Sequence, residues 1–167
     1  TKFPAEFDRV TDILTYPQYW AFILTGKKVS EVTSLGVHTD LWSPNDADFS
    51  SLVKAQGWRR LFPEIAPTRG VLSTLLPSIA QRTGLDKNTP IASGIHDSNA
   101  SLLPYLLGSN EKISVVSSGT WTITMSPGAS TQNLDENRDS LANVDAFGRA
   151  VPTARFMGGR EFSVLMG

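Results

Sequence analysis

The chain has 167 residues, of which 40% are hydrophobic and 19% are charged, and this composition is typical of a globular protein that buries a core. Its net charge of −1 argues against a nucleic-acid partner. The absence of cysteine excludes disulfides, cysteine-ligated zinc and thiol nucleophiles, and it is compatible with a reducing cytosol, so we expect a cytoplasmic protein. Apolar runs fall far short of the roughly 20 residues that span a bilayer, so we expect no membrane partner.

Helices dominate the prediction for the first third of the chain. Apolar residues at helical spacing run over residues 13–24, where Pro17 suits the first turn and Gly26 is the expected stop. A later helix is expected to be capped by Asp48 and to end at Gly57.

Shorter units follow in the middle of the chain. Pro77 opens a predicted helix that Gly84 closes, and residues 90–94 predict a short buried strand. Asp97 stands at the start of the next predicted helix, which extends to Gly108. Strands that alternate with helices in this way favour an α/β fold.

Beyond Gly108 the hydrophobic period changes from helical to alternating. Two hairpin strands are expected over residues 112–117 and 121–125, followed by a loop over 130–143. A third strand is expected over residues 150–157 and a helix over 160–166. The change of pattern predicts two domain parts, residues 1–108 and 109–167, with the boundary near Gly108 to Glu111.

A core within the second part alone would be marginal, because a domain of about 60 residues buries only about 60% of its unfolded surface. Thr1 and Gly167 look less like natural termini than like cuts, so we expect a fragment of a longer protein. A cut core exposes sheet edges and apolar faces, and these favour association with a second copy or with a partner.

One candidate site is the motif Gly94-Ile95-His96-Asp97-Ser98, between a predicted strand and a predicted helix. Ligands bind at the carboxyl ends of strands in open α/β sheets, and a helix N-terminus stabilises an anion. Of the two histidines in the chain, only His96 has an acidic neighbour. The alternative is that Asp97 simply caps the helix and His96 is an ordinary loop residue.

A second candidate site is the turn Ser117-Ser118-Gly119-Thr120. Its small side chains leave backbone N–H groups accessible and add hydroxyl donors, and such a turn can cradle phosphate. The alternative is a plain hairpin turn. Trp121 adjoins this turn, so among the tryptophans it is the one whose place suits sugar stacking rather than the core.

A metal site is the third possibility, with His38, Asp40, His96, Asp97 and a later Asp grouped as in the helical His-Asp phosphohydrolases. Here the His-Asp pair follows a predicted strand, and no pair of ligands has the spacing of one helix face. We therefore expect no metal ion bound directly by side chains.

Taken together and in this order, the two motifs resemble those of the FGGY carbohydrate kinases, in particular the rhamnulokinase and fuculokinase branch. The segment Pro17–Gly26 is similar to that family's helix ending in Leu-Thr-Gly, and nearly all of the chain shares the resemblance. It implies a ribonuclease-H-like fold of the actin and hexokinase type, with one domain for sugar and one for nucleotide. It also implies that this chain spans the end of domain I and the start of domain II.

The resemblance further implies roles for individual residues. Asp97 matches the general base that takes the proton from the attacking sugar hydroxyl, and His96 and Ser98 match positions that contact the sugar together with it. Gly119 and Thr120 match the turn that faces the phosphates of ATP, through which Mg²⁺ is held. This agrees with the chemistry of phosphoryl transfer, which needs chiefly positioning, charge stabilisation and one carboxylate within reach of the nucleophile.

Departures from the family pattern limit what the chain is expected to do alone. The family's first phosphate loop with its early aspartate and its later glycine-rich adenosine segment do not occur in the sequence. The asparagine that the branch offers to the sugar near residues 155–161 is not evident, which leaves the sugar open. We expect the isolated fragment to be inactive. The alternative is a non-catalytic module, derived from a sugar kinase, that binds a sugar or a partner.

Overall fold

The computed structural model describes residues 4–108 and 113–166, without the side chain of His38. Its α-helices are α1 (Pro4–Phe7), α2 (Tyr16–Thr25), α3 (Val32–His38), α4 (Ser51–Ala55), α5 (Pro77–Thr83), α6 (Asp97–Gly108) and α7 (Gly158–Met166). Its strands are β1 (Trp42–Ser43), β2 (Asp48–Phe49), β3 (Ser73–Thr74), β4 (Pro90–Ile91), β5 (Val115–Ser118), β6 (Thr122–Met125), β7 (Ser140–Val144) and β8 (Ala150–Phe156). Within the described residues, no helix is long and apolar enough to cross a bilayer.

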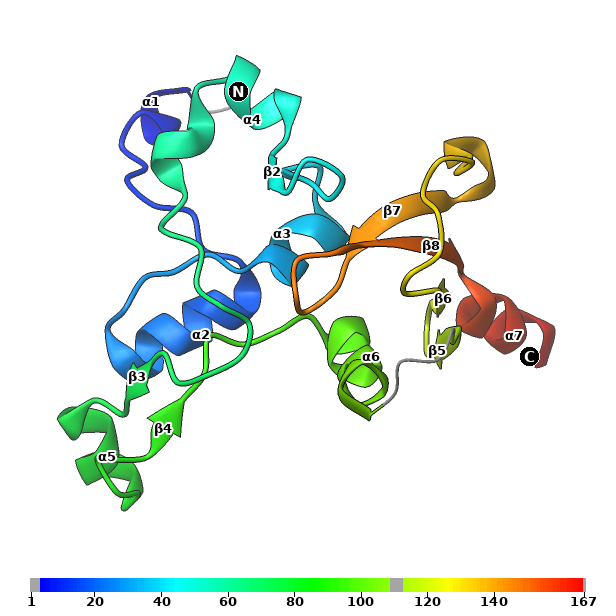
Figure 1. Ribbon diagram of the computed structural model, residues 1–167. Helices are drawn as coiled ribbons and strands as arrows, with labels where there is room; N and C mark the ends of the chain where they lie inside the picture. Colours follow the sequence, from blue (N-terminus) through cyan, green and yellow to red (C-terminus); the bar gives the residue numbers. More distant parts are fainter. Residues whose placement is uncertain (1–3, 109–112, 167) are drawn as a thin grey trace.

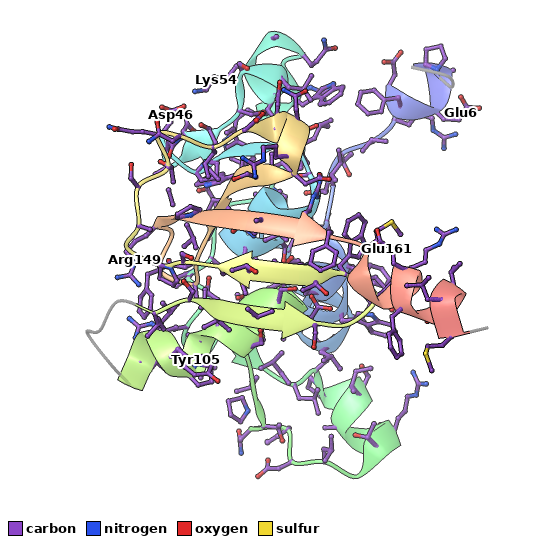
Figure 2. The ribbon with its side chains drawn as sticks, turned by 90° about the vertical axis from the view of Figure 1, so that its right-hand side faces the viewer. Glu6, Asp46, Lys54, Tyr105, Arg149 and Glu161 are labelled. Atoms are coloured by element: carbon purple, nitrogen blue, oxygen red, sulfur yellow. The ribbon has the colours of Figure 1, made fainter. Side chains whose placement is uncertain are left out.

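The largest sheet is antiparallel, with the strand order β5-β6-β8-β7. Figure 2 looks onto this sheet, with α3 and α6 behind it, and Figure 1 shows α7 at the end of β8. The strands β1 with β2 and β3 with β4 form two separate two-stranded ladders. The described chain is therefore a mixed α/β structure in which helices from the first part cover one face of the sheet.

Two apolar clusters make up the core. One joins α3, β2 and α4 through the buried side chains Leu35, Phe49 and Val53, with Phe62 beside them. The other joins α6 to the large sheet, where Leu102 packs with side chains of β6 and β8. Since α6 begins at Asp97, this second cluster positions the first sequence motif against the sheet.

A close backbone approach joins α3 to β7. A Cβ atom added at Gly36 would lie 2.6 Å from Cγ1 of Val144, which is fully buried. The carbonyl of Val144 also accepts a hydrogen bond of 2.5 Å from Nδ2 of Asn99 on α6. Val144 is thus held by two helices, and we call these contacts the Val144 seam.

Helix α2 holds the segment that leads to Asp97. Its first turn contains Pro17 and its end is Gly26 with φ 74°, as expected from the sequence. The buried amide of Gln18 donates to the carbonyls of Ser93 and Gly94 at 2.9 and 3.3 Å. These bonds tie α2 to the first motif.

Several sequence predictions are confirmed. Helix α5 runs from Pro77 and is closed by Gly84 at φ 74°. The hairpin β5–β6 turns where expected, since Ser118 pairs with Thr122. Lys112 lies outside the described residues, and so does most of the predicted boundary near residue 108, which stays a prediction.

Other predictions are wrong. Asp48 lies in β2, and α4 is capped by Ser50, whose hydroxyl accepts from Val53 N. Residues 90–94 are not a buried strand, because β4 is confined to Pro90–Ile91, where Pro90 is exposed and Ile91 is half-buried. The expected loop over residues 130–143 ends early, since β7 begins at Ser140 and pairs with β8.

The Val144 seam generates a stability prediction. Gly36→Ala should lower the free energy of unfolding by about 1–3 kcal/mol, because the new methyl group overlaps a buried side chain on a strand. The double variant Gly36→Ala/Val144→Ala should lose less free energy of unfolding than the two single variants lose together, because alanine at position 144 leaves room for the new methyl group at position 36. Urea unfolding of all four proteins measures this coupling, and strict additivity would contradict the packing argument.

Candidate active site

The structure brings the two sequence motifs together. A cleft of about 380 Å³ is lined by His96, Asp97 and Ser98 at the start of α6 and by the turn and strand at residues 117–121 and 123. The two segments are separated in sequence and come from different predicted domain parts. Every residue assigned to the site from sequence, including Gly119 and Thr120, lines this one cleft.

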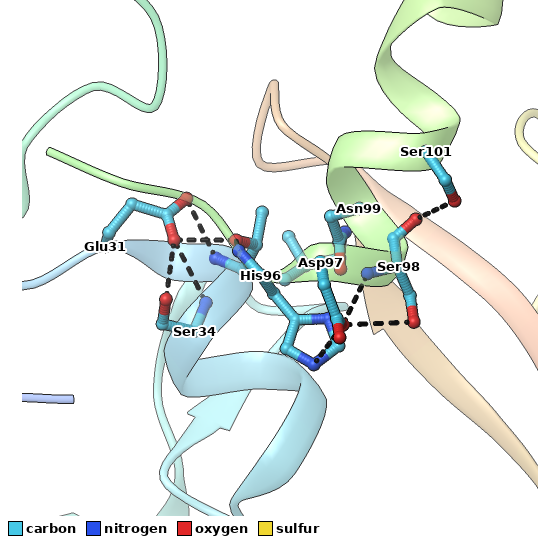
Figure 3. Close-up of polar contacts among 9 residues, drawn as sticks. Glu31, Ser34, His96, Asp97, Ser98, Asn99 and Ser101 are labelled. Carbon is cyan, nitrogen blue, oxygen red and sulfur yellow. Dashed lines mark hydrogen bonds and ion pairs between the residues drawn. The ribbon is translucent and has the colours of Figure 1, made fainter. Parts of the chain in front are cut away.

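Asp97 offers an exposed carboxylate to the cleft. Its side chain is 92% exposed, and its Oδ1 accepts hydrogen bonds from the Ser98 amide at 2.6 Å and the Ser98 hydroxyl at 3.4 Å (Figure 3). Nε2 of His96 lies 3.2 Å from the same oxygen. The carboxylate is thus oriented by its neighbours while it stays open to a ligand.

Behind this exposed group lies a buried polar network. His96 is buried, and its backbone N–H donates to Oγ1 of Thr33 at 3.1 Å. Thr33 Oγ1 in turn donates to the carboxylate of Glu31 at 2.6 Å. The network therefore connects the first turn of α3 to the residue next to Asp97.

Glu31 is the centre of that network and is fully buried. It caps α3 by accepting from the backbone amides of Thr33 and Ser34 at 3.1 and 3.0 Å. The hydroxyls of Ser34 and Thr68 also donate to it. Sequence reasoning missed Glu31, because glutamate is not among the residues preferred at an N-cap.

The β5–β6 turn differs in one respect from the sequence prediction. The N–H of Gly119 donates to the carbonyl of Trp121 at 2.9 Å, so this amide is engaged within the turn. Ser117, Ser118 and Thr120, which carry hydroxyl groups, line the cleft beside it. The turn therefore offers hydroxyl-bearing residues to phosphate oxygens, while the Gly119 amide is already engaged.

The start of α7 supports this turn from behind. A Cβ atom added at Gly159 would lie 2.0 Å from the carbonyl oxygen of Gly119 and 3.1 Å from Cα of Thr120. Only glycine permits this approach. The sequence signal was the pair Gly158-Gly159 at the start of a predicted helix, which the sequence analysis did not use.

Neither the carboxylates with shifted pKa values nor any group of metal-ligating side chains adds a described residue to the cleft. Hydrogen bonds from Lys28 and Lys54 lower the pKa values of Asp12 and Asp48, but neither carboxylate lines the cleft. Among the described side chains, which exclude that of His38, no three His, Asp or Glu residues are grouped to hold a metal ion.

Two family models match the chain. Residues 1–104 match the N-terminal domain of the FGGY family of carbohydrate kinases, and residues 110–167 match the C-terminal domain of carbohydrate kinase FGGY. The chain is 30% identical over 153 residues to the rhamnulokinase of Oceanobacillus iheyensis and 31% identical over 138 residues to the L-fuculokinase of Escherichia coli K12. These matches cover 85% and 76% of the chain but only 31% and 29% of the relatives. The chain thus spans about a third of their length.

Solved structures agree with these matches. A carbohydrate kinase from Novosphingobium aromaticivorans covers 99% of the chain with a TM-score of 0.86 at 45% identity, and the matching part is 38% of that protein. Xylulose kinase from Rhodospirillum rubrum has a TM-score of 0.74 over 97% of this chain at 18% identity, matches over 33% of its own chain, and shares the fold. The expected α/β fold is confirmed as a mixed α/β chain with an actin-like fold.

The buried network predicts a loss of stability on removal of one hydroxyl. Thr33→Val keeps the shape of the side chain but leaves the buried amide of His96 without this acceptor, so the free energy of unfolding should fall by about 1–3 kcal/mol. The backbone amide resonance of His96 should also shift. Thr83→Val, on the exposed face of α5, is the control and should change neither quantity; an equal effect of both variants would refute the network.

Close packing behind the β5–β6 turn predicts a contrast between two glycines. Gly159→Ala should lower the free energy of unfolding by about 1–3 kcal/mol and shift the resonances of the Gly119 turn, because the new methyl group would collide with backbone. Gly108→Ala places its methyl group in open space and should change the free energy of unfolding by less than about 0.5 kcal/mol. Equal thermal denaturation midpoints for the two variants would show that the turn does not depend on Gly159.

Proposed function

Because this chain belongs to the FGGY family of carbohydrate kinases, we propose that it carries the centre of an enzyme that transfers the γ-phosphoryl group of ATP to a hydroxyl of a sugar, a ketose or a deoxy-sugar. The observation that supports this reaction best is the shared cleft. Asp97 and the hydroxyl-rich turn at residues 117–120 line it from opposite domain parts, as a transfer between two substrates requires.

Asp97 is the proposed general base. As the sugar hydroxyl attacks the γ-phosphorus, its proton passes to the Asp97 carboxylate, the new O–P bond forms, and the bond to ADP breaks. The exposed carboxylate has the freedom to meet a sugar hydroxyl, while the bonds from Ser98 and the nearby His96 orient it.

His96 and Ser98 are the proposed sugar contacts beside Asp97. The buried position of His96 gives this side of the cleft a fixed wall, and the Ser98 hydroxyl lies within 3.4 Å of Asp97 Oδ1. Both side chains can exchange hydrogen bonds with sugar hydroxyls, which are donors and acceptors at once.

The nucleotide is proposed to meet the other wall of the cleft, at Gly119 and Thr120. In this assignment residues 1–108 hold the sugar and residues 109–167 begin the nucleotide domain. Mg²⁺ would arrive on the phosphates of ATP and neutralise their charge. Thr120 and its neighbouring hydroxyls are suited to phosphate oxygens, and Gly159 would hold their turn in place.

The 167 residues alone are proposed to be inactive, because they lack the family's first phosphate loop, and most catalysis of phosphoryl transfer comes from positioning. The alternative, a non-catalytic module that binds a sugar or a partner, predicts no turnover even in the protein made from the complete reading frame. A cytoplasmic location, and self-association through exposed edges, also stay predictions.

Asp97→Asn tests the proposed role. In the protein made from the complete reading frame, kcat for ATP-dependent phosphorylation should fall about 10²- to 10⁴-fold, because the amide cannot accept the proton as a carboxylate does. ATP affinity, measured by calorimetry, should change little, since Asp97 belongs to the wall of the cleft that is proposed to hold the sugar.

Asp46→Asn is the matched control, since it removes one exposed carboxylate that does not line the cleft (Asp46 is labelled in Figure 2). It should keep normal turnover. Near-normal phosphorylation by Asp97→Asn would refute the general-base assignment. Failure of the wild-type protein to phosphorylate any member of a panel of ketoses and deoxy-sugars would refute the kinase assignment.

A further inference from the structure

A second, smaller pocket of about 150 Å³ adjoins the cleft that holds Asp97. Trp121 and Ile123 line both spaces. The smaller pocket is completed by Gly36 and Val37 of α3 and by side chains of β7 and β8. The two spaces therefore meet at these two side chains, and a molecule that contacts Asp97 would have to pass them to reach the smaller pocket.

Arg155 lies at the shared wall. It is the direct partner of Ile123 in the pairing of β6 with β8, so the two side chains stand next to each other on one face of the sheet. Its guanidinium carbon lies 5.6 Å from the centre of the Trp121 ring, within the range of a cation–π contact. Strand pairing and the ring together place this charge beside the cleft.

The charge of Arg155 is only weakly neutralised. None of the described residues that line the smaller pocket is acidic. Nε of Arg155 donates to Oδ1 of Asp139 over a long 3.4 Å, and the Asp139 side chain is 57% exposed. An exposed ion pair of this kind contributes little free energy, so an anionic group of a ligand in the pocket can replace Asp139 as the partner of Arg155 at little cost.

Charge and shape favour a carboxylate as that anion. A volume of about 150 Å³, against about 30 Å³ for one water molecule, has room for such a group. The planar fork of a guanidinium matches a carboxylate through two parallel hydrogen bonds. A methyl or hydroxymethyl group at the same place would leave Arg155 with only the long contact to the exposed Asp139.

We propose that Arg155 selects the sugar, and that the acceptor carries a carboxylate at the end remote from the reacting hydroxyl. The sugar then lies along Trp121, with its reacting hydroxyl at Asp97 and its acidic end at Arg155. This inference rests on the proposed function, because it concerns the acceptor of the same reaction. It narrows the substrate class from ketoses in general to sugar acids such as hexuluronates.

Matched substrate pairs test the proposal in the protein made from the complete reading frame. D-Fructose with D-fructuronate, and D-tagatose with D-tagaturonate, differ within each pair only in a hydroxymethyl group or a carboxylate at C6. For at least one pair, kcat/KM with ATP should be about 10- to 100-fold higher for the acid, which corresponds to hydrogen bonds with a charged partner.

Variants assign that preference to one side chain. Arg155→Gln should abolish it, with the loss mainly in kcat/KM for the acid, whereas Arg155→Lys should keep part of it. Arg82→Gln removes an equal charge from the exposed face of α5 and should leave the ratio unchanged. Circular dichroism and thermal midpoints establish that the variants are folded. If Arg155→Gln does not fold, Arg155→Lys still tests the role of this side chain.

The outcomes separate the two proposals. Turnover of neutral or deoxy-sugars without preference for acids, or a preference that survives in Arg155→Gln, overturns the role of Arg155 and leaves the kinase assignment intact. No turnover of any sugar contradicts the kinase assignment, and calorimetry with the two uronates then decides the inference. Tighter binding of a uronate by the wild type than by Arg155→Gln supports it, and equal or absent binding overturns it.

Discussion

The contacts of Val144 hold the two halves of the cleft together. Its side chain meets the backbone of Gly36, where any larger residue would collide, and its carbonyl accepts a hydrogen bond from the buried Asn99. Both partners precede residue 109, while Val144 belongs to the sheet that follows. The sheet cannot slide along α3 and α6 without opening a cavity or breaking a buried hydrogen bond. The position of the β5–β6 turn opposite Asp97 depends on this seam.

The cleft combines a rigid frame with one exposed reactive group. On one side, the buried carboxylate of Glu31 fixes Thr33, and Thr33 holds the backbone of His96. On the other side, Gly159 lets α7 press against the turn at Gly119. Asp97 stands between these supports with its side chain almost fully exposed. A site on such supported elements can present its polar groups in one geometry while the reacting carboxylate stays accessible to a ligand.

Predictions from sequence succeeded where a residue acts on its own backbone. Pro17 and Gly84 mark a helix start and a helix end because the proline ring and the absent side chain restrict or extend φ locally. They failed where a neighbour in space decided the outcome. Residues 130–143 are mostly polar, as in a loop, yet their last four residues belong to β7 because β8 offers its edge for pairing. Asp48 suits a helix cap, but pairing with β1 takes it into a strand and leaves the cap to Ser50.

The sequence by itself determined the chemistry available and its local frame, since a carboxylate at a helix start and a hydroxyl-rich hairpin turn depend only on residues close together in the chain. It also carried the resemblance that pointed to a sugar kinase. Only the tertiary structure decided that the two motifs share one cleft, that Glu31 supports His96 and that Arg155 stands beside Trp121. These are contacts between distant segments, and they exist because apolar burial and strand pairing, which no local pattern specifies, bring α3, α6 and the sheet together.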